Sequence, residues 1–358
     1  MIIDAVKIFI PAVIAFIFGI IITSPISNFL YSHKMWKQKA GKKSLDGTDA
    51  VVFNELHKDK EINTPRMGGM VIWISAFITI IGLWLLDKIT MLPVFDKLDL
   101  LSRSQTWIPL MTLMVGAFIG LIDDYLTIKR SRGEMGSGGL SLSQRLIPVI
   151  LIGLFCGYWF YAKLGISTLG TPGLFGGFDM GVFFILFFAL VTLATYSGTV
   201  IDGLDGLSGG IFATIFSAYA IIAFYQQQIN LAGFCFVIVG SILAFLWFNI
   251  PPARFYMSET GSMALTITLA VVAFMTDRLG GGYGVFVLPI IALPLVITVG
   301  SNLIQVLSKK YRGRKVFHVA PIHHHFEAIG WPSYKVVMRY WVIGIISALI
   351  GVVLALVG

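Results

Sequence analysis

The chain has 358 residues, of which 57% are hydrophobic and only 12% are charged, and its mean hydropathy is +0.86. This composition excludes an ordinary soluble domain and indicates a membrane protein. The formal net charge of +8 suits anionic lipid headgroups or phosphorylated substrates, and we expect no nucleic acid among the partners.

Ten apolar runs follow one another along the chain, each with roughly the 17 to 25 residues that an α-helix needs to cross a bilayer. In chain order they cover residues 8–30, 67–86, 107–122, 146–161, 180–196, 207–225, 231–248, 262–275, 283–307 and 336–357. The first is longer than the core of a signal peptide and no small-residue cleavage site follows it, so we expect a retained helix. The sequence therefore predicts an all-α, polytopic membrane protein with a single transmembrane domain, residues 1–358.

Lysine and arginine are unevenly distributed between the loops. Of the 26 lysines and arginines, 20 lie in or beside the loops after odd-numbered runs, which are residues 31–66, 123–145, 197–206, 249–261 and 308–335. By the positive-inside rule these loops face the cytoplasm and both termini face outward. Topology alone therefore explains much of the net positive charge.

Four groups of polar residues fall where an apolar run meets one of these loops. They are Asp123 and Asp124 at the end of the third run, Asp202 and Asp205 after the fifth, Glu259 before the eighth, and His323, His324 and His325 after the ninth. Carboxylates so close to hydrocarbon are costly unless they are paired, solvated or bound to a cation. Because all four groups fall on the same side of the membrane, we expect one site on the cytoplasmic face.

Each acidic group has an ordinary structural explanation beside the functional one. Residues 123–124 could be a helix-end pair that reaches water, and residues 202–206 a glycine-rich turn with two solvated aspartates. In the functional interpretation, Asp202 and Asp205 would share a face if that stretch is helical. Glu259 could belong to a helix start capped by Thr260 or Ser262. Together, beside basic loops, these groups predict Mg²⁺ and a phosphorylated substrate, because Mg²⁺ prefers a few carboxylates with phosphates and water. Phosphoryl transfer itself needs mainly positioning and charge neutralisation.

The three adjacent histidines, residues 323–325, can ligate a metal, exchange protons and form hydrogen bonds. A polar loop or a tag-like metal-binding tract would explain them too. A tag would lie at a terminus, however, whereas this run lies between a basic stretch and the last apolar run. We therefore interpret it as part of a functional site.

In order and spacing, these motifs resemble those of the phospho-N-acetylmuramoyl-pentapeptide transferases, a branch of the polyprenyl-phosphate N-acetylhexosamine-1-phosphate transferases. The resemblance extends from Thr64 to the end of the last apolar run, and the triple histidine separates this branch from its relatives. Ten helices with both ends outside is also the topology of that family. The matching segments are Thr64-Pro65-Arg66-Met67-Gly68-Gly69, Asp123-Asp124-Tyr125, Asp202-Gly203-Leu204-Asp205-Gly206-Leu207, Trp247-Phe248-Asn249, and Ala320-Pro321-Ile322-His323-His324-His325 with Glu327 and Gly330.

The resemblance implies an enzyme of the bacterial inner membrane that transfers phospho-MurNAc-pentapeptide from UDP-MurNAc-pentapeptide to undecaprenyl phosphate, giving lipid I and UMP. Asp123 or Asp124 would activate the lipid phosphate, and His323 would serve catalysis. The cofactor would be Mg²⁺, held by Glu259 with Asp123 and Thr199 as further ligands, and the histidines would handle phosphate and protons. The residues that would contact the substrates are Asp202, Asp205, Tyr256, Asn249, Arg145, Lys60, His324 and His325.

Three departures from the family pattern concern the metal site and the sugar specificity. Ser258 and Glu259 stand where the family has Gly-Asp, so the expected metal ligand is longer by one methylene, although Mg²⁺ coordination is strict. Tyr196 and Thr199 stand where the family has two asparagines, the second of which helps to hold the metal. Arg66 replaces the threonine common in this branch and is closer to the Pro-Arg pattern of the wider superfamily.

Three alternatives follow from these departures and from the intramembrane charges. The chain could transfer a different HexNAc-1-phosphate from another UDP-sugar, or it could be an inactive homologue. A transporter would be expected to carry its carboxylates near the middle of the membrane, often on broken helices, whereas here they lie at predicted helix ends. A homodimer also stays open, because an apolar dimer interface resembles a lipid-facing surface.

Overall fold

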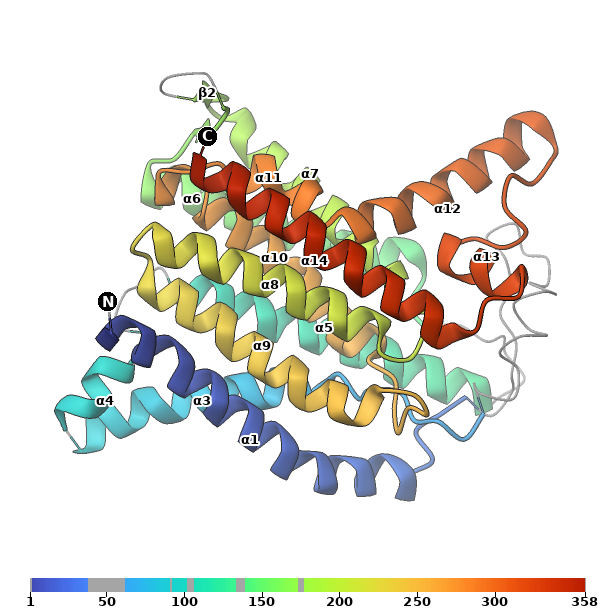
Figure 1. Cartoon of the computed structure of the whole chain (residues 1–358), viewed down its shortest axis with the longest axis horizontal. Helices are drawn as coiled ribbons and strands as arrows, with labels where there is room; N and C mark the ends of the chain where they lie inside the picture. Colours follow the sequence, from blue (N-terminus) through green and yellow to red (C-terminus); the bar gives the residue numbers. More distant parts are fainter. Residues whose placement is uncertain are drawn as a thin grey trace.

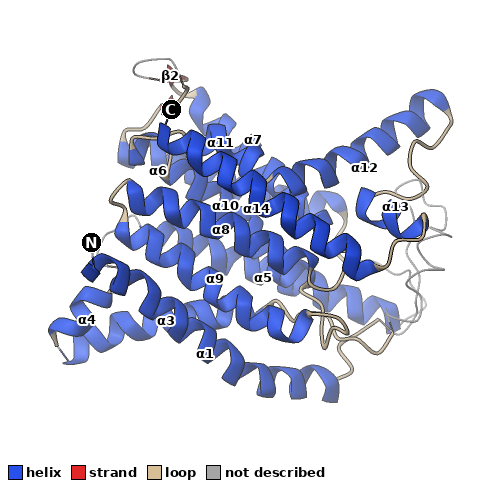
Figure 2. Ribbon diagram, viewed as in Figure 1, coloured by secondary structure: helices blue, strands red, loops and turns tan. Residues whose placement is uncertain are grey.

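A computed structural model describes residues 2–37, 62–90, 92–101, 106–132, 139–172 and 177–357 of the chain. Within these ranges nearly all regular structure is α-helical (Figure 2). The strands β1 (Thr168–Leu169) and β2 (Phe178–Asp179) form an antiparallel pair. The all-α prediction is therefore confirmed.

Nine helices in the described part of the chain are long and apolar enough to cross a membrane. They are α1 (Ile2–Ser32), α3 (Met70–Thr90), α5 (Trp107–Arg132), α6 (Leu142–Leu164), α7 (Phe183–Ser197), α8 (Leu207–Tyr225), α9 (Ile229–Asn249), α10 (Ser258–Met275) and α14 (Ser333–Val357). A tenth candidate is the pair α11 (Gly284–Ile291) and α12 (Leu293–Arg312), which together are long and apolar enough but meet at a bend of 69°. These elements correspond to the ten apolar runs, which confirms the polytopic architecture.

The bend between α11 and α12 corrects the prediction of one continuous span over residues 283–307. Pro294 lies in the first turn of α12, where its missing backbone N–H costs the helix no hydrogen bond. Beyond the bend, α12 points away from the other helices (Figure 1). Hydropathy did not reveal the break because both halves are apolar.

Among the helices that extend further than their apolar runs predicted, two carry carboxylates of the predicted site. α5 continues beyond Asp123 and Asp124, so this pair lies within the helix instead of at its end. α10 already includes Glu259 in its first turn, so Thr260 and Ser262 lie inside the helix and do not cap it. Both differences have one cause. An apolar run read from hydropathy stops at the first charged residue, whereas a helix continues past that residue when neighbouring groups form hydrogen bonds or ion pairs with it.

The helices form a bundle whose two ends differ. Both termini lie at one end, where the C-terminus is close to β2, and α13 (Ile322–Ala328) lies at the other end (Figure 1). The short elements α4 (Pro93–Leu98), η2 (Gly198–Ile201) and η3 (Arg278–Gly280) connect the spans. We call the end that carries α13 the α13 end of the bundle.

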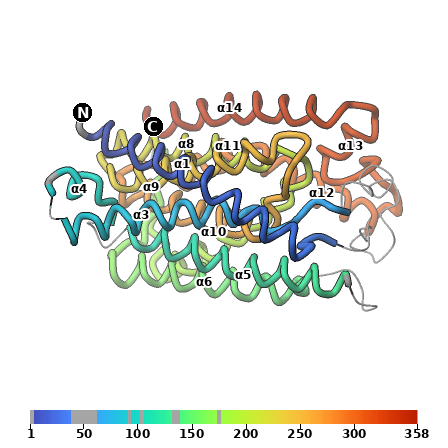
Figure 3. The backbone as a smooth tube through the Cα atoms, turned by 90° about the horizontal axis from the view of Figure 1, so that it is seen from below, coloured from blue at the N-terminus to red at the C-terminus, as the bar shows by residue number. Residues whose placement is uncertain are grey.

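α10 lies in the middle of the bundle, between α14 on one side and α5 and α6 on the other (Figure 3). Every residue of α10 except Glu259 is buried. Gly120 lets α5 approach the start of α10, because a Cβ at Gly120 would overlap the backbone carbonyl of Glu259. Small residues allow such close contact between helix backbones. The contact places Asp123 and Asp124 beside the first turn of α10.

Candidate active site

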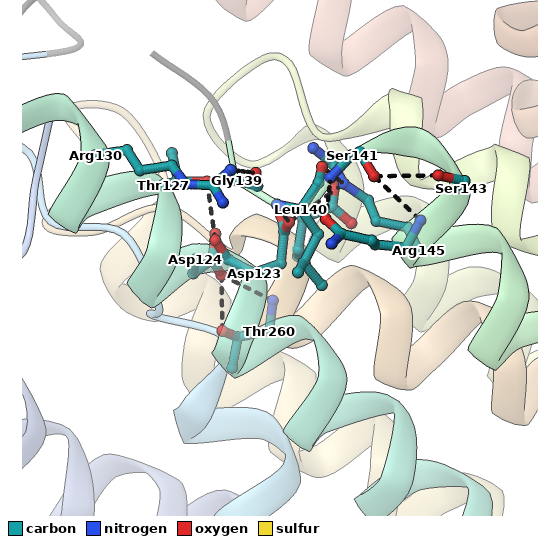
Figure 4. A network of polar contacts seen from close by, with 12 residues as sticks. Asp123, Asp124, Thr127, Arg130, Gly139, Leu140, Ser141, Ser143, Arg145 and Thr260 are labelled. Carbon is teal, nitrogen blue, oxygen red and sulfur yellow. Dashed lines mark hydrogen bonds and ion pairs between the residues drawn. The ribbon is translucent and has the colours of Figure 1, made fainter. Parts of the chain in front are cut away.

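Asp124 is fully buried and both of its carboxylate oxygens are occupied. Oδ2 accepts hydrogen bonds from the backbone N of Thr260 at 2.9 Å and from its Oγ1 at 2.7 Å (Figure 4). Oδ1 accepts from Nε and Nη2 of Arg66 at 3.2 and 3.0 Å. Four donors therefore surround this one carboxylate, which binds the Arg66 loop to the first turn of α10.

Asp123 lies beside the start of α6, and its carboxylate and that of Glu259 both contact the guanidinium of Arg145. Its Oδ1 accepts a hydrogen bond from the backbone N of Leu140 at 2.6 Å and lies 3.2 Å from Nε of Arg145 (Figure 4). Nη1 of the same arginine lies 3.3 Å from Oε1 of Glu259. Arg145 therefore joins α6, the carboxylate of α5 and the first turn of α10.

Glu259 has one carboxylate oxygen that a cation could use. Its Oε2 is buried and, among the described residues, accepts no hydrogen bond. A buried acceptor without a partner is costly, and a bound cation would remove that cost. Within the described ranges no three His, Cys, Asp or Glu side chains converge on a metal position. The site therefore fits Mg²⁺ only in its usual form, with one or two carboxylates and with substrate phosphates and water as the other ligands.

Asp202 and Asp205 lie in the turn between η2 and α8. The turn is not helical, so the two side chains do not share a helix face. Asp202 accepts hydrogen bonds from the Ser208 hydroxyl at 2.7 Å and from the backbone N of Ser258 at 2.8 Å. Burial raises the pKa of Asp202 above its ordinary value, and these two hydrogen bonds oppose the shift. Asp205 instead accepts from the backbone N of Ala253 at 3.4 Å.

Asn249, at the end of α9, connects two backbone segments of the site. Its Oδ1 accepts a hydrogen bond from the backbone N of Gly206 at 2.9 Å, and its Nδ2 donates to the carbonyl of Phe255 at 2.9 Å. The side chain is buried, so these contacts fix the 202–206 turn against the start of α10. Its contact with a substrate stays a prediction.

Two of the three adjacent histidines pack on the same turn. A Cβ at Gly203 would overlap Nε2 of His323 and come within 2.8 Å of Nε2 of His324. Both histidines are buried. A glycine is therefore needed at position 203 for these rings to reach the Asp202–Asp205 segment.

The second and third histidines have different partners. Nδ1 of His324 donates to Oε2 of Glu327 at 2.8 Å, and Oε1 of Glu327 accepts from the Ser333 hydroxyl at 2.6 Å. A carboxylate partner fixes which ring nitrogen carries the proton, and this arrangement directs Nε2 of His324 toward Gly203. His325 stacks on His318 with ring centroids 5.4 Å apart. Burial and the neighbouring His318 lower the pKa of His325.

Known proteins match this chain along most of its length. Residues 106–277 match the family described as glycosyl transferase family 4. The phospho-N-acetylmuramoyl-pentapeptide-transferase of Anoxybacillus flavithermus is 34% identical over 295 residues, which cover 82% of this chain and 84% of that protein. The proteins of the same name from Listeria innocua and Levilactobacillus brevis are each 35% identical, over 297 and 298 residues, with 82% of this chain and 85% of each relative covered. The chain belongs to the phospho-N-acetylmuramoyl-pentapeptide-transferase family.

Family membership and the fold together establish the general class of this protein. The relatives are bacterial enzymes, and the chain has nine apolar helices and a broken pair within its described residues. It is a multi-pass protein of the bacterial inner membrane and an enzyme of the glycosyl-1-phosphate transferase class. Its reaction is the transfer of a sugar-1-phosphate to a polyprenyl phosphate.

The structure accounts for the glycine that the phospho-N-acetylmuramoyl-pentapeptide-transferase family has at the position of Ser258. This residue adopts φ +56°, in the left-handed region where a Cβ is unfavourable. Its backbone N donates to Asp202 and its carbonyl accepts from the Ser262 hydroxyl. The conformation is therefore held by backbone contacts that a glycine would also make.

The other departures from the family pattern lie close to the same carboxylates. Tyr196 is buried in an apolar cluster that includes Met263, and it interacts electrostatically with Glu259 and Arg145. Thr199 lies half-buried in η2, and its carbonyl accepts a hydrogen bond from the backbone N of Asp202 at 3.1 Å. Metal binding by Thr199 stays a prediction.

Tyr256 and Lys60 are two further residues that the sequence predicted to bind substrate. Tyr256 is half-buried, and its backbone is held by the carbonyl of Pro65 and by the N–H of Gly68, at 2.9 and 2.8 Å. Lys60 lies outside the described residues. The predicted contact of each with substrate stays untested.

Some residues of the site could not be recognised from the sequence. Arg66 stood out as a departure from the family pattern but not as the partner of Asp124, which lies 58 positions away. Leu140 contributes only its backbone N–H, which leaves no sequence signal. Glu327 belonged to the matching family segment, and its contact with His324 at helical spacing was a usable signal.

Proposed function

We propose that this chain transfers phospho-MurNAc-pentapeptide from UDP-MurNAc-pentapeptide to undecaprenyl phosphate, forming lipid I and releasing UMP. This reaction is the first membrane step of peptidoglycan synthesis. The observation that carries the proposal is the packing of His323 and His324 on Gly203 in the Asp202–Asp205 turn, because the triple histidine distinguishes this branch of the superfamily. The names of the relatives support the same substrate.

We also propose that residues 1–358 form one transmembrane domain whose α13 end faces the cytoplasm. The loops at that end carry most of the lysines and arginines, as expected for cytoplasmic loops. A soluble nucleotide-sugar would then reach the site from the cytoplasm. The lipid phosphate would reach it from the adjacent membrane leaflet.

The reaction forms a bond between an oxygen of the lipid phosphate and the sugar-bound phosphorus of the nucleotide-sugar. The phosphorus–oxygen bond to UMP breaks, and UMP leaves with the bonding electrons. Mg²⁺, bound by Glu259 with Asp123 and Thr199 as further ligands, would neutralise charge on the phosphates. Glu259 is assigned first because its Oε2 accepts no hydrogen bond from the residues described.

The remaining catalytic and substrate-binding roles are assigned to side chains of the protein. Asp123 is the better candidate to take a proton from the lipid phosphate, because four donors already occupy Asp124. His323 would act as the second catalytic residue. The residues that would bind the phosphates, the nucleotide and the sugar are Arg145, Lys60, Asp202, Asp205, Asn249, Tyr256, His324 and His325.

A different UDP-HexNAc donor is the second candidate. Arg66 replaces the threonine common in the muramoyl-pentapeptide branch, and Tyr196 and Thr199 replace two asparagines near the Asp202–Asp205 turn. Because these positions lie around the carboxylates, they could change which sugar is accepted. The triple histidine favours the muramoyl-pentapeptide donor.

Release of UMP by the purified protein decides between these donors. The assay combines protein in detergent with undecaprenyl phosphate and Mg²⁺, and supplies either UDP-MurNAc-pentapeptide or UDP-GlcNAc. We expect release with the first donor and its loss in Asp123→Asn, which keeps the size of the side chain. Release with UDP-GlcNAc alone would assign the second function, and no release with either donor would indicate an inactive homologue. Full activity of both Asp123→Asn and Asp124→Asn would contradict the catalytic assignment.

A further inference from the structure

The first turn of α10 is capped by side chains from other parts of the chain. Met257, the residue before the helix, makes no capping hydrogen bond with its side chain, although the first N–H groups of a helix have no partner within it. Asp202 accepts from the backbone N of Ser258, and Asp124 accepts from the backbone N of Thr260. Negative charge at this end of a helix is favourable. Two carboxylates of the site therefore hold the helix start.

The contact of Asp124 with α10 is double, and it lies next to Glu259. The carboxylate accepts from both the backbone N and the hydroxyl of Thr260, at 2.9 and 2.7 Å. Thr260 follows Glu259 directly, so the position of Asp124 fixes the backbone from which the Glu259 side chain extends. On the other side, Arg145 holds Oε1 of Glu259.

Arg66 holds the oxygen of Asp124 that faces away from Thr260. Two of its N–H groups reach Oδ1 at 3.2 and 3.0 Å, and the carboxylate between them and Thr260 is fully buried. A charge buried in this way needs its partner, since removal of one partner leaves the other uncompensated. The threonine common in this branch is too short and uncharged to replace this contact.

The loop that carries Arg66 is fastened to the segment that precedes α10. The backbone N–H groups of Gly68 and Gly69 donate to the carbonyls of Tyr256 and Met257 at 2.8 and 3.2 Å. The N–H of Tyr256 donates in return to the carbonyl of Pro65 at 2.9 Å. The guanidinium therefore has a fixed position relative to the helix start.

We propose that Arg66 is a positioning residue, which holds Asp124 as the cap of α10 and thereby fixes Glu259 for the phosphoryl transfer. Its effect on turnover rests on the proposed function, whereas its effect on the helix start does not. Asp123 and Asp124 are adjacent but have different roles in this proposal. Asp123 takes part in the reaction, and Asp124 holds the start of α10. It also gives a role to a residue that departs from the family pattern.

A thermal double-mutant cycle tests the link between Arg66 and Asp124 without any substrate. The variants are Arg66→Thr, Asp124→Asn and the double variant, and the measurement is the midpoint of thermal unfolding in detergent. We expect each single variant to lower the midpoint and the double variant to lower it no further than the worse single one. Additive losses would show that the two residues act independently and would overturn the proposal.

Turnover measurements separate positioning from direct contact with substrate. With the donor that the wild-type protein accepts, we expect Arg66→Thr to lower kcat about tenfold, with KM for both substrates changed less than about twofold. Arg66→Lys keeps the charge and should recover part of the lost kcat, whereas Arg66→Gln should not. Raised KM with an unchanged unfolding midpoint would instead make Arg66 a substrate ligand and overturn the proposal.

The thermal cycle and the turnover measurements distinguish failure of the proposed function from failure of the positioning role. If the wild-type protein transfers neither sugar, the proposed function fails, and the thermal cycle still decides whether Arg66 holds the start of α10 through Asp124. If transfer occurs but the losses of kcat in Arg66→Thr and Asp124→Asn multiply in the double variant, the proposed function stands and the positioning role fails.

Discussion

Arg145 and Glu259 are in contact through Nη1 and Oε1, 3.3 Å apart, which joins α6 to the first turn of α10. The same guanidinium lies 3.2 Å from Oδ1 of Asp123 through Nε. One cation thus holds two carboxylates to which we assign chemistry. The contact between Arg145 and Glu259 depends on the length of the Glu259 side chain, which is one methylene longer than the aspartate usual in the family.

Glu259→Asp should lower turnover, although it restores the family residue. The substitution withdraws the carboxylate by roughly 1 Å and so breaks its contact with Arg145. A hydrogen bond between charged groups contributes about 1.5–3 kcal/mol, which corresponds to a loss of about 10- to 150-fold. UMP release measures this loss, and Glu259→Gln, which keeps the length but not the charge, is the matched control. Faster turnover of Glu259→Asp would show that the site is built for the shorter acid.

Gly203→Ala should disturb the histidines on the Asp202–Asp205 turn. The added Cβ would overlap His323 and lie 2.8 Å from Nε2 of His324, so the rings have to move. We expect a loss of unfolding free energy of about 1–3 kcal/mol and a larger fractional loss of turnover. Gly300→Ala is the control, because a Cβ there has no neighbouring atom within 4 Å; it should leave turnover unchanged and should not lower the unfolding free energy, since alanine favours a helix interior over glycine. Normal activity in Gly203→Ala would separate the histidines from the reaction.

The membrane spans could be predicted because the thickness of the bilayer sets their length. Their ends could not, since contacts that are distant in the sequence determine them. α10 begins at Ser258 because Asp202 and Asp124, from two other segments, accept its first N–H groups. The break between α11 and α12 was also hidden, because the residues on both sides of the bend are apolar.

The residues of the site were easier to predict than their partners. Carboxylates and histidines at the ends of apolar runs are conspicuous. In the structure Asp124 and Asp202 contact the start of α10, and His323 and His324 pack on the turn that carries Asp202. A partner is visible in the sequence only when it is local, as Glu327 is for His324 at helical spacing. The hydrogen bond from Trp341 Nε1 to the carbonyl of Gly206 joins residues 135 positions apart, and no local sequence pattern predicts it.

Ser258→Gly should stabilise the protein. Ser258 adopts φ +56°, and this conformation costs a residue with a Cβ about 1–2 kcal/mol. Glycine removes that cost and keeps the backbone contacts with Asp202 and Ser262. We expect the unfolding free energy to rise by about 1 kcal/mol, which thermal unfolding measures. Ser258→Ala keeps the Cβ and should give no gain, and an equal gain in both variants would locate the effect in the lost hydroxyl.

Asp277, at the end of the bundle opposite α13, should make the protein more stable in mild acid. Its carboxylate is buried and accepts from the backbone N of Gly170, Arg278 and Val285 at 2.6, 3.0 and 3.0 Å. Burial raises the pKa of Asp277 to about 6, against these hydrogen bonds. Between its ordinary pKa of 3.8 and that value, the folded protein binds a proton that the unfolded chain releases. Stability from this group therefore rises as pH falls through 6, by up to about 3 kcal/mol.

The unfolding midpoint at about pH 5 and pH 7 tests this prediction through the difference between the wild-type protein and Asp277→Asn. The amide does not titrate, so the variant should lose the part of the acid stabilisation that Asp277 supplies. Asp179→Asn is the control at the same end of the bundle. The pKa of Asp179 lies below its ordinary value because the backbone N–H of Gly181 donates to it, and it therefore does not titrate in this range. An equal pH dependence in the wild-type protein and Asp277→Asn would show that the backbone donors keep the buried carboxylate ionised throughout.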